Sequence, residues 1–256
     1  MKVKNQIFCF LLTALGFMTN SCQKPVEIPV EKTGMVKVTF KNTVKGVPLV
    51  LSTGNYTNGF GEQYIITKFK YYISNVSVNN LDVRTAETES YHLIDESKPA
   101  SLSFGYAAKV DTYSTLNFLI GVDSLRNVSG AQTAALDPLN DMFWTWNSGY
   151  IMAKIEGNSP QSAIVNNKVE YHIGGFSGTN SVLKKLSLSL PAGKSLQVRE
   201  GKISEIFIEA DLDTWWQNPF DLKISVNPAI TTPGATAKQI SDNYAKMFVI
   251  KDVINY

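Results

Sequence analysis

Two histidines, His92 and His172, are the side chains of this sequence best suited to binding a transition metal. A neutral imidazole nitrogen binds copper well, and carboxylate or carbonyl oxygens can complete the coordination sphere. Each histidine follows a tyrosine and precedes a leucine or isoleucine, so a strand would turn the imidazole away from these neighbours. The same pattern fits a histidine that only forms a hydrogen bond within a strand. The residues alone leave both interpretations open.

Thiolate ligands are not expected in the folded part, because the two cysteines, Cys9 and Cys22, lie near the N-terminus. Lys2 and Lys4 precede the apolar run 7–18, which is too short to span a membrane. Ser21 and Cys22 resemble the end of a bacterial lipoprotein signal. We therefore expect residues 1–21 to be a signal peptide and Cys22 to carry the lipid. The anchor would hold the chain in the bacterial envelope, at the outer membrane on its periplasmic or surface side. Residues 22–34 would be a polar tether, and simple secretion is the alternative.

Tryptophans occur in two pairs. Trp144 and Trp146 stand one residue apart, so in an extended chain their indoles would share one face. A buried indole contributes a large apolar area and has one N–H group that needs a partner. Trp215 and Trp216 are adjacent, so in a strand one would be buried and the other exposed, where it could stack on a sugar ring. The alternative is that this pair packs against a C-terminal helix.

A long acidic connection offers a second type of metal site. Carboxylate and amide oxygens are the ligands that calcium takes in proteins, although the spacing is not that of an EF-hand. The alternative is that these side chains bind backbone groups of their own loop. The candidate oxygen donors are Asp123, Asn127, Asp137, Asn140 and Asp141.

Catalytic motifs are not found in the sequence. It has no G-x-S-x-G elbow, no phosphate-binding loop and no H-E-x-x-H pattern, so we do not expect an enzyme. The net charge is +2, and both excess positive charges belong to Lys2 and Lys4 in the expected signal peptide. The mature chain is then neutral, which gives no indication of a nucleic-acid partner or of binding to an anionic membrane surface.

Alternating apolar and polar residues predict strands along most of the chain. The alternation is regular in residues 35–43, 186–190 and 203–212, and no convincing helix lies between the strands. We therefore predict an all-β fold, a single antiparallel β-sandwich with long loops, as one domain over residues 35–256. A short C-terminal helix is expected within residues 235–249. The predicted core includes Phe118, Ile120, Trp144 and Ile155.

Several short stretches have residue orders that are distinctive of a protein family. They are FKYYISNVSV (69–78), YHLID (91–95), IGVDSLRN (120–127), LDP (136–138), MFWTWNSGY (142–150), KIEG (154–157) and YHIGGFSG (171–178). Together they resemble the MbnP-like family of periplasmic and surface copper-binding proteins, over roughly residues 36–216.

This resemblance implies a lipid-anchored copper-binding protein. Characterised relatives bind one copper ion through histidines and a kynurenine, an oxidised tryptophan that a dihaem peroxidase of the MauG type produces. By resemblance, His172 matches a His-Ile/Leu-Gly element of the family, and His92 is the second candidate ligand. Trp144 and Trp146 are the candidates for modification. A glycan- or protein-binding β-sandwich lipoprotein without metal is the alternative function.

Overall fold

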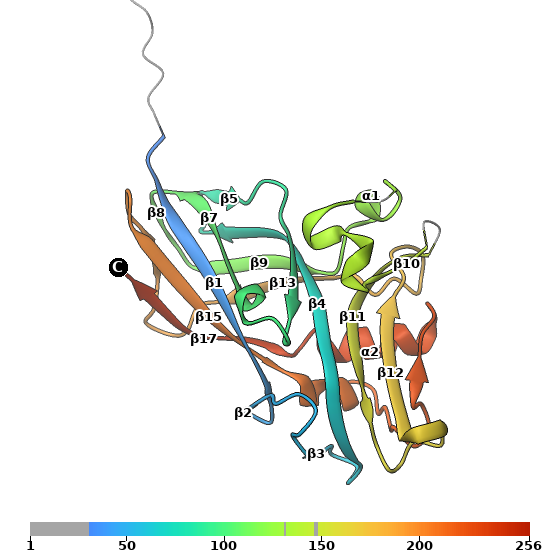
Figure 1. Ribbon diagram of the computed structural model, residues 1–256. Coiled ribbons are helices and arrows are strands. Elements are labelled where there is room, and N and C mark those ends of the chain that lie inside the picture. The colour runs from blue at the N-terminus through green and yellow to red at the C-terminus, as the bar shows by residue number, and fades with distance from the viewer. Residues whose placement is uncertain (1–30, 131, 146–147) are drawn as a thin grey trace, which may run out of the picture. The chain divides into compact units, whose positions relative to one another are not determined.

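Strands of alternating polarity build two mixed β-sheets, which contribute most of the core (Figure 1). The computed structural model describes residues 31–130, 132–145 and 148–256, of which residues 32–256 form one unit. The smaller sheet has five strands, the larger sheet has ten and is strongly curled, and β8 and β14 form a separate two-stranded ribbon.

The elements alternate between long strands and short connecting strands. The strands are β1 (Thr33–Val44), β2 (Val47–Pro48), β3 (Tyr56–Thr57), β4 (Gln63–Asn79), β5 (Arg84–Ala86), β6 (Tyr91–Asp95), β7 (Ser103–Lys109), β8 (Asp111–Tyr113), β9 (Thr115–Ile120), β10 (Phe143–Thr145), β11 (Gly149–Asn158), β12 (Lys168–Gly174), β13 (Lys184–Ser189), β14 (Leu196–Val198), β15 (Ile203–Asp211), β16 (Ala229–Ile230) and β17 (Phe248–Asn255). The α-helices are α1 (Ser124–Asn127) and α2 (Ala235–Tyr244), and 3₁₀ helices lie at Pro99–Leu102, Ala134–Leu136, Pro138–Asn140, Val165–Asn167 and Leu212–Trp216. Within the described ranges, no helix has the length and apolar character needed to cross a membrane.

Strand direction is where the fold departs from the prediction. β1 lies inside the smaller sheet, antiparallel to β7 on one side and parallel to β15 on the other. β12 and β16 are also parallel. The fold is therefore mostly β, as predicted, but its sheets are mixed and not purely antiparallel. Alternation predicts which face of a strand is buried, whereas the direction in which a distant strand returns is set by the long path between the two strands.

The long strand β4 organises the larger sheet. Its first half pairs with β11 and its second half with β9. Tyr71 has partners in both β11 and β6, and Ile73 has partners in both β9 and β6. β11 and β9 therefore lie along one edge of β4, and β6 lies along the other.

The two faces of the larger sheet have different surroundings. Tyr71 and Phe118 point toward the smaller sheet, where their rings lie 6.0 Å from Phe40 and 5.3 Å from Phe248, respectively. We call this the inner face. The outer face carries the alternate residues, and the connection between β9 and β10 covers part of it, since Tyr72 donates a hydrogen bond to the carbonyl of Ala135.

Most of the predicted core residues are buried. Phe118, Ile120 and Ile155 are no more than 3% exposed. Trp144 is half-buried and packs at the edge of the core, so its assignment to the core is corrected. The reason is its position on β10, a three-residue strand that pairs with β11 alone.

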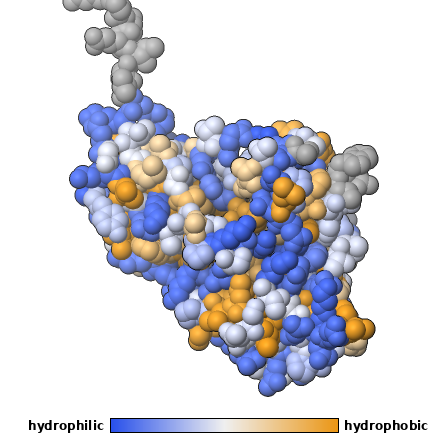
Figure 2. All heavy atoms as spheres, in the orientation of Figure 1, coloured by the Kyte–Doolittle hydropathy of each residue, from blue (hydrophilic) through white to orange (hydrophobic). Residues whose placement is uncertain are grey.

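The C-terminal segment is a helix followed by a strand. α2 ends at Tyr244, and Phe248 begins β17, which pairs with β15 at the edge of the smaller sheet. The predicted helix is therefore confirmed but shorter. On the face seen in Figure 2, hydrophobic residues are scattered among hydrophilic ones. Three of the most exposed apolar side chains, Leu81, Leu139 and Val165, belong to three separate connections.

Candidate functional site

His172 lies on β12 and points to the outer face of the larger sheet. Its neighbours Tyr171 and Ile173 are buried on the inner face, so strand alternation turns the imidazole outward. Nε2 lies 3.0 Å from Oε1 of Glu156 on β11, and the side chain is 17% exposed. Burial and the nearby Lys154 ammonium lower the pKa of His172 below its usual value. The imidazole is therefore neutral and able to ligate at neutral pH.

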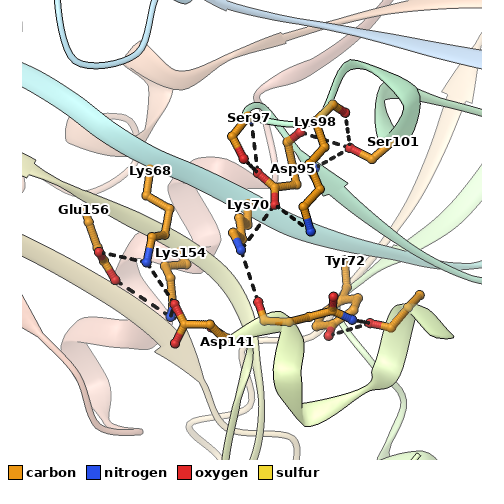
Figure 3. A network of polar contacts seen from close by, with 12 residues as sticks. Lys68, Lys70, Tyr72, Asp95, Ser97, Lys98, Ser101, Asp141, Lys154 and Glu156 are labelled. Carbon is orange, nitrogen blue, oxygen red and sulfur yellow. Dashed lines mark hydrogen bonds and ion pairs between the residues drawn. The ribbon is translucent and has the colours of Figure 1, made fainter. Parts of the chain in front are cut away.

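Charged residues are aligned with His172 across four strands. Asp95 of β6 stands opposite Lys70 of β4, Lys70 opposite Lys154 of β11, and Lys154 opposite His172. Residues directly opposite each other in neighbouring strands share a face. Figure 3 shows Lys70 turned toward Asp95, with Lys68 and Lys154 turned toward Asp141 and Glu156. This row is therefore a network of ion pairs in which His172 stands at one end.

Asp141 connects the loop between β9 and β10 to this network through ion pairs. Its Oδ2 accepts a hydrogen bond from Nζ of Lys68 at 2.8 Å and lies 3.0 Å from Nζ of Lys154. Burial alone would raise the pKa of Asp141, but the hydrogen bonds from the two lysines outweigh burial and lower it to about 2. Nζ of Lys68 also lies 3.2 Å from Oε2 of Glu156, the carboxylate beside His172. The loop and the imidazole are therefore held through shared lysines.

Trp144 covers the end of β12 on the same face as His172. A Cβ atom added to Gly174 would lie 2.5 Å from a ring carbon of Trp144, so the indole packs directly on the glycine backbone. Gly174 is two residues from His172, and the two Cα atoms are about 7 Å apart along a strand. The structure thus brings the imidazole and one of the two candidate indoles onto neighbouring positions of one strand face.

His92 lies on the opposite face of the sheet from His172. It stands opposite Ile73 of β4 and points toward the smaller sheet, where its ring stacks on Phe104 with centroids 3.5 Å apart. Its Nε2 lies 2.8 Å from Oε2 of Glu87. Three strand spacings, about 14 Å, and the thickness of the sheet separate the two imidazoles. The expectation that both histidines bind one copper ion is therefore corrected.

On this face the described residues offer a metal ion one imidazole, that of His172. His172 offers a neutral nitrogen, but its carboxylate neighbour Glu156 is already paired with Lys68 and lies 3.8 Å from Nζ of Lys154. In the described part of the chain, no group of three or more His, Cys, Asp or Glu side chains is arranged to hold a metal ion. Trp146 and Cys22 lie outside the described residues. A complete metal site at His172 would therefore need a further donor.

Most of the candidate calcium ligands in the acidic connection already have partners within the protein. Asp123 caps α1 by accepting a hydrogen bond from the backbone N–H of Arg126, and Asp137 accepts one from the N–H of Leu139. Asn127 accepts a hydrogen bond from the backbone N–H of Tyr150 through its amide oxygen, Asn140 donates to the carbonyl of Ala134 through its amide nitrogen, and Asp141 pairs with lysines. These contacts support the interpretation in which the side chains bind groups of the protein itself and not calcium.

Trp215 and Trp216 are both buried, at 1% and 2% exposed. They lie in a 3₁₀ helix, not in a strand, so alternation does not send one of them outward. Trp215 packs 5.0 Å from the ring of Tyr244 on α2, and Trp216 packs 5.0 Å from Tyr64. Packing on the C-terminal helix is therefore confirmed, and the possibility of an exposed sugar-stacking indole is excluded for this pair.

The lysines of the outer face, which form the ion-pair network beside His172, were missed by the sequence analysis. Lys154 is 1% exposed although it carries a charge, and Lys70 is 8% exposed. A lysine within an otherwise apolar strand such as residues 149–155 is costly to bury unless its ammonium group is paired. The single charge of Lys154 within this apolar segment could therefore have indicated a polar network on this face.

These observations define a class of protein, a β-rich scaffold of two mixed sheets that carries an imidazole and an indole on one sheet face. Residues 33–233 match the model of the MbnP family. The chain belongs to the MbnP family, as its sequence motifs indicated. One solved structure with a similar fold is MbnP from Methylosinus trichosporium, which is 15% identical with a TM-score of 0.51. The match covers 88% of this chain and 99% of that chain. No curated protein matches the chain.

Proposed function

We propose that this chain is a lipid-anchored copper-binding protein of the bacterial cell envelope, with no enzymatic activity of its own. The observation that carries the proposal is the shared outer face of His172 and Trp144 at the end of β12. Membership of the MbnP family supports the same function. Cys22 would carry the lipid, and residues 22–34 would tether the folded domain to the membrane.

Each residue of this face has a distinct role in the proposal. His172 supplies the imidazole ligand, and Glu156 orients the ring through its hydrogen bond. Lys154 and burial keep the imidazole neutral, because a protonated ring cannot bind a metal. A kynurenine formed from Trp144 or Trp146 would supply the second donor, and a dihaem peroxidase of the MauG type would be the partner that forms it. Copper, when bound, would act as a Lewis acid suited to imidazole nitrogen, with the further donor completing its coordination.

The second candidate function is a glycan- or protein-binding module that holds no metal. The separation of His92 and His172 across the sheet favours it, because the described residues supply one imidazole to the copper site instead of two. In that case the ion-pair network around Lys154 would serve only to hold the loop in place.

Copper titration combined with intact-mass measurement distinguishes the two functions. The purified chain is titrated before and after reaction with a MauG-type peroxidase, and bound metal is measured after dialysis. The copper proposal predicts a mass change that maps to Trp144 or Trp146 and one bound copper ion per chain. A chain that remains unmodified and free of copper after the reaction supports the metal-free module.

A further inference from the structure

A second polar surface lies on the outer face of the larger sheet, toward the far end of β4. It is a groove of about 420 Å³ that crosses β5, β4, β9 and β13. These strands are in register, so that Ser77, Asn117 and Ser187 stand side by side across three of them. None of the groove residues belongs to the His172 network, so the surface is separate from the proposed copper site.

The local fold places polar side chains on this surface. Leu116 and Phe118 are buried on the inner face, so alternation leaves Asn117 pointing outward. A bulge between Ser74 and Ser77 adds a residue to β4, and Asn75, with φ 54°, occupies the added position. A bulge re-aims side chains without ending the sheet. The result is a set of amide and hydroxyl groups on a rigid sheet.

One of these groups has no hydrogen-bond partner among the described residues. The amide of Asn79 has a buried Oδ1 without a partner. Ser77, which also lines the groove, is only 1% exposed. By contrast, the buried amides of Asn127 and Asn243 each donate to backbone carbonyls. Because buried polar groups are normally paired, the groove is suited to a ligand that supplies donors and acceptors.

The charge of the groove is positive. Arg84 on β5 and Lys185 on β13 line its opposite corners, and no carboxylate lines it. Neither cation has an ion-pair partner among the described residues, unlike Lys68 and Lys154 in the network described above. Arg84 and Lys185 lie three strands apart in the sheet and are offset by four residues along the strand direction. Their Cα atoms are therefore about 20 Å apart. A complementary ligand therefore carries two acidic groups separated by a neutral, hydrogen-bonding stretch.

The geometry points to an acidic oligosaccharide as the occupant of this groove. Sugar hydroxyls both donate and accept hydrogen bonds, which matches the amides of Asn79 and Asn117 and the hydroxyl of Ser77. Carboxylate groups along the saccharide match Arg84 and Lys185 at the two corners. This site does not depend on copper, because no residue is shared between the two.

Calorimetry with a defined saccharide tests this site. Tetragalacturonate is titrated into the mature chain, and its fully methyl-esterified form is the uncharged control ligand. We expect the acid to bind with an affinity that falls as salt concentration rises, and the ester to bind much more weakly. The double variant Arg84→Gln/Lys185→Gln should bind the acid about tenfold more weakly or worse, since both cations are lost. Asn117→Ala should also weaken binding.

A matched control variant separates the groove from general charge effects. Lys41→Gln/Lys202→Gln removes two positive charges from exposed positions outside the groove. It should bind tetragalacturonate as the unaltered chain does. The inference is overturned if the unaltered chain does not bind tetragalacturonate, if the ester binds equally well, or if both double variants weaken binding equally. Copper titration of the same samples reports separately on the proposed function.

Discussion

At the scale of single residues, the proton affinity of His172 depends on the groups around its ring. Burial and the Lys154 ammonium disfavour the protonated imidazole, whereas the carboxylate of Glu156 favours it. The first two effects prevail, and the pKa is lowered from 6.5. The same lysine pairs with Asp141, so one ammonium group both holds the loop and keeps the imidazole available as a ligand.

Copper binding should therefore depend on pH, and Glu156 should influence the pH at which binding is lost. Affinity is expected to fall only at a pH below the ordinary titration range of histidine, because the pKa of His172 is lowered and its protonation competes with the metal. Glu156→Gln removes the carboxylate that favours protonation, so the fall should move to lower pH. Copper titrations over a pH series measure both curves. A fall that moves to higher pH in Glu156→Gln would contradict this role.

The pairing of Asp141 with two lysines predicts a contribution to acid stability. Its pKa is lowered from 3.8 to about 2 in the folded protein. The unfolded chain therefore takes up the proton first, and the stabilisation present above about pH 4 is lost as the pH falls toward 2. Asp141→Asn should remove this part of the pH dependence. Urea unfolding at pH 5 and pH 3 measures it, and an equal loss of stability in both proteins would argue against the pairing.

At the scale of elements, β12 and β10 meet where Trp144 lies on Gly174. The indole can approach the strand because Gly174 has no side chain, and a Cβ there would also lie 2.9 Å from the carbonyl oxygen of Tyr150. Any donor formed from Trp144 is therefore held by the backbone of the strand that carries His172.

Gly174→Ala should destabilise the fold by about 1–3 kcal/mol, because the added methyl group overlaps the Trp144 ring. In a Trp144→Ala background the same substitution should cost less, since the ring is gone and only the Tyr150 carbonyl remains close. Chemical unfolding of the four proteins gives the coupling energy of this double-mutant cycle. A coupling energy near zero would mean that the indole does not rest on Gly174 in solution.

Element positions could be predicted better than element directions. The alternation in residues 35–43 and 203–212 located β1 and β15, because one face of each strand is buried. Their parallel pairing could not be predicted, since alternation is the same in either direction. The strand β17 was missed because Met247 and Phe248 continue the helical stripe of α2 by one turn. A similar limit applies to His92 and His172, whose flanking residues are alike although the two rings point to opposite faces of the sheet.

At the scale of the whole molecule, the MbnP family fold presents two distinct polar surfaces on one sheet. One is the His172 face, which the loop ending at Asp141 partly covers, and the other is the open groove near Ser77. The family motifs could be found in the sequence because they are contiguous stretches. The lysine network could not, because Lys68, Lys70 and Lys154 meet only when β4 and β11 pair.

The proposed lipid anchor gives a prediction for the intact chain. Cys22→Ser should release the protein from the membrane fraction, because the thiol that accepts the lipid is lost while the domain over residues 32–256 is unchanged. Membrane fractionation and intact-mass measurement of the purified protein check this. Wild-type fractionation of the variant would show that Cys22 is not the anchor.

The copper stoichiometry of two histidine variants is the most direct test of the proposed copper site at His172. His172→Ala and His92→Ala remove the same side chain from opposite faces of the sheet, and both chains are titrated with copper after reaction with the peroxidase. We expect His172→Ala to lose stoichiometric copper, whereas His92→Ala should still bind one ion per chain. Full copper binding by His172→Ala, or loss of copper in His92→Ala with an intact fold, would contradict this expectation.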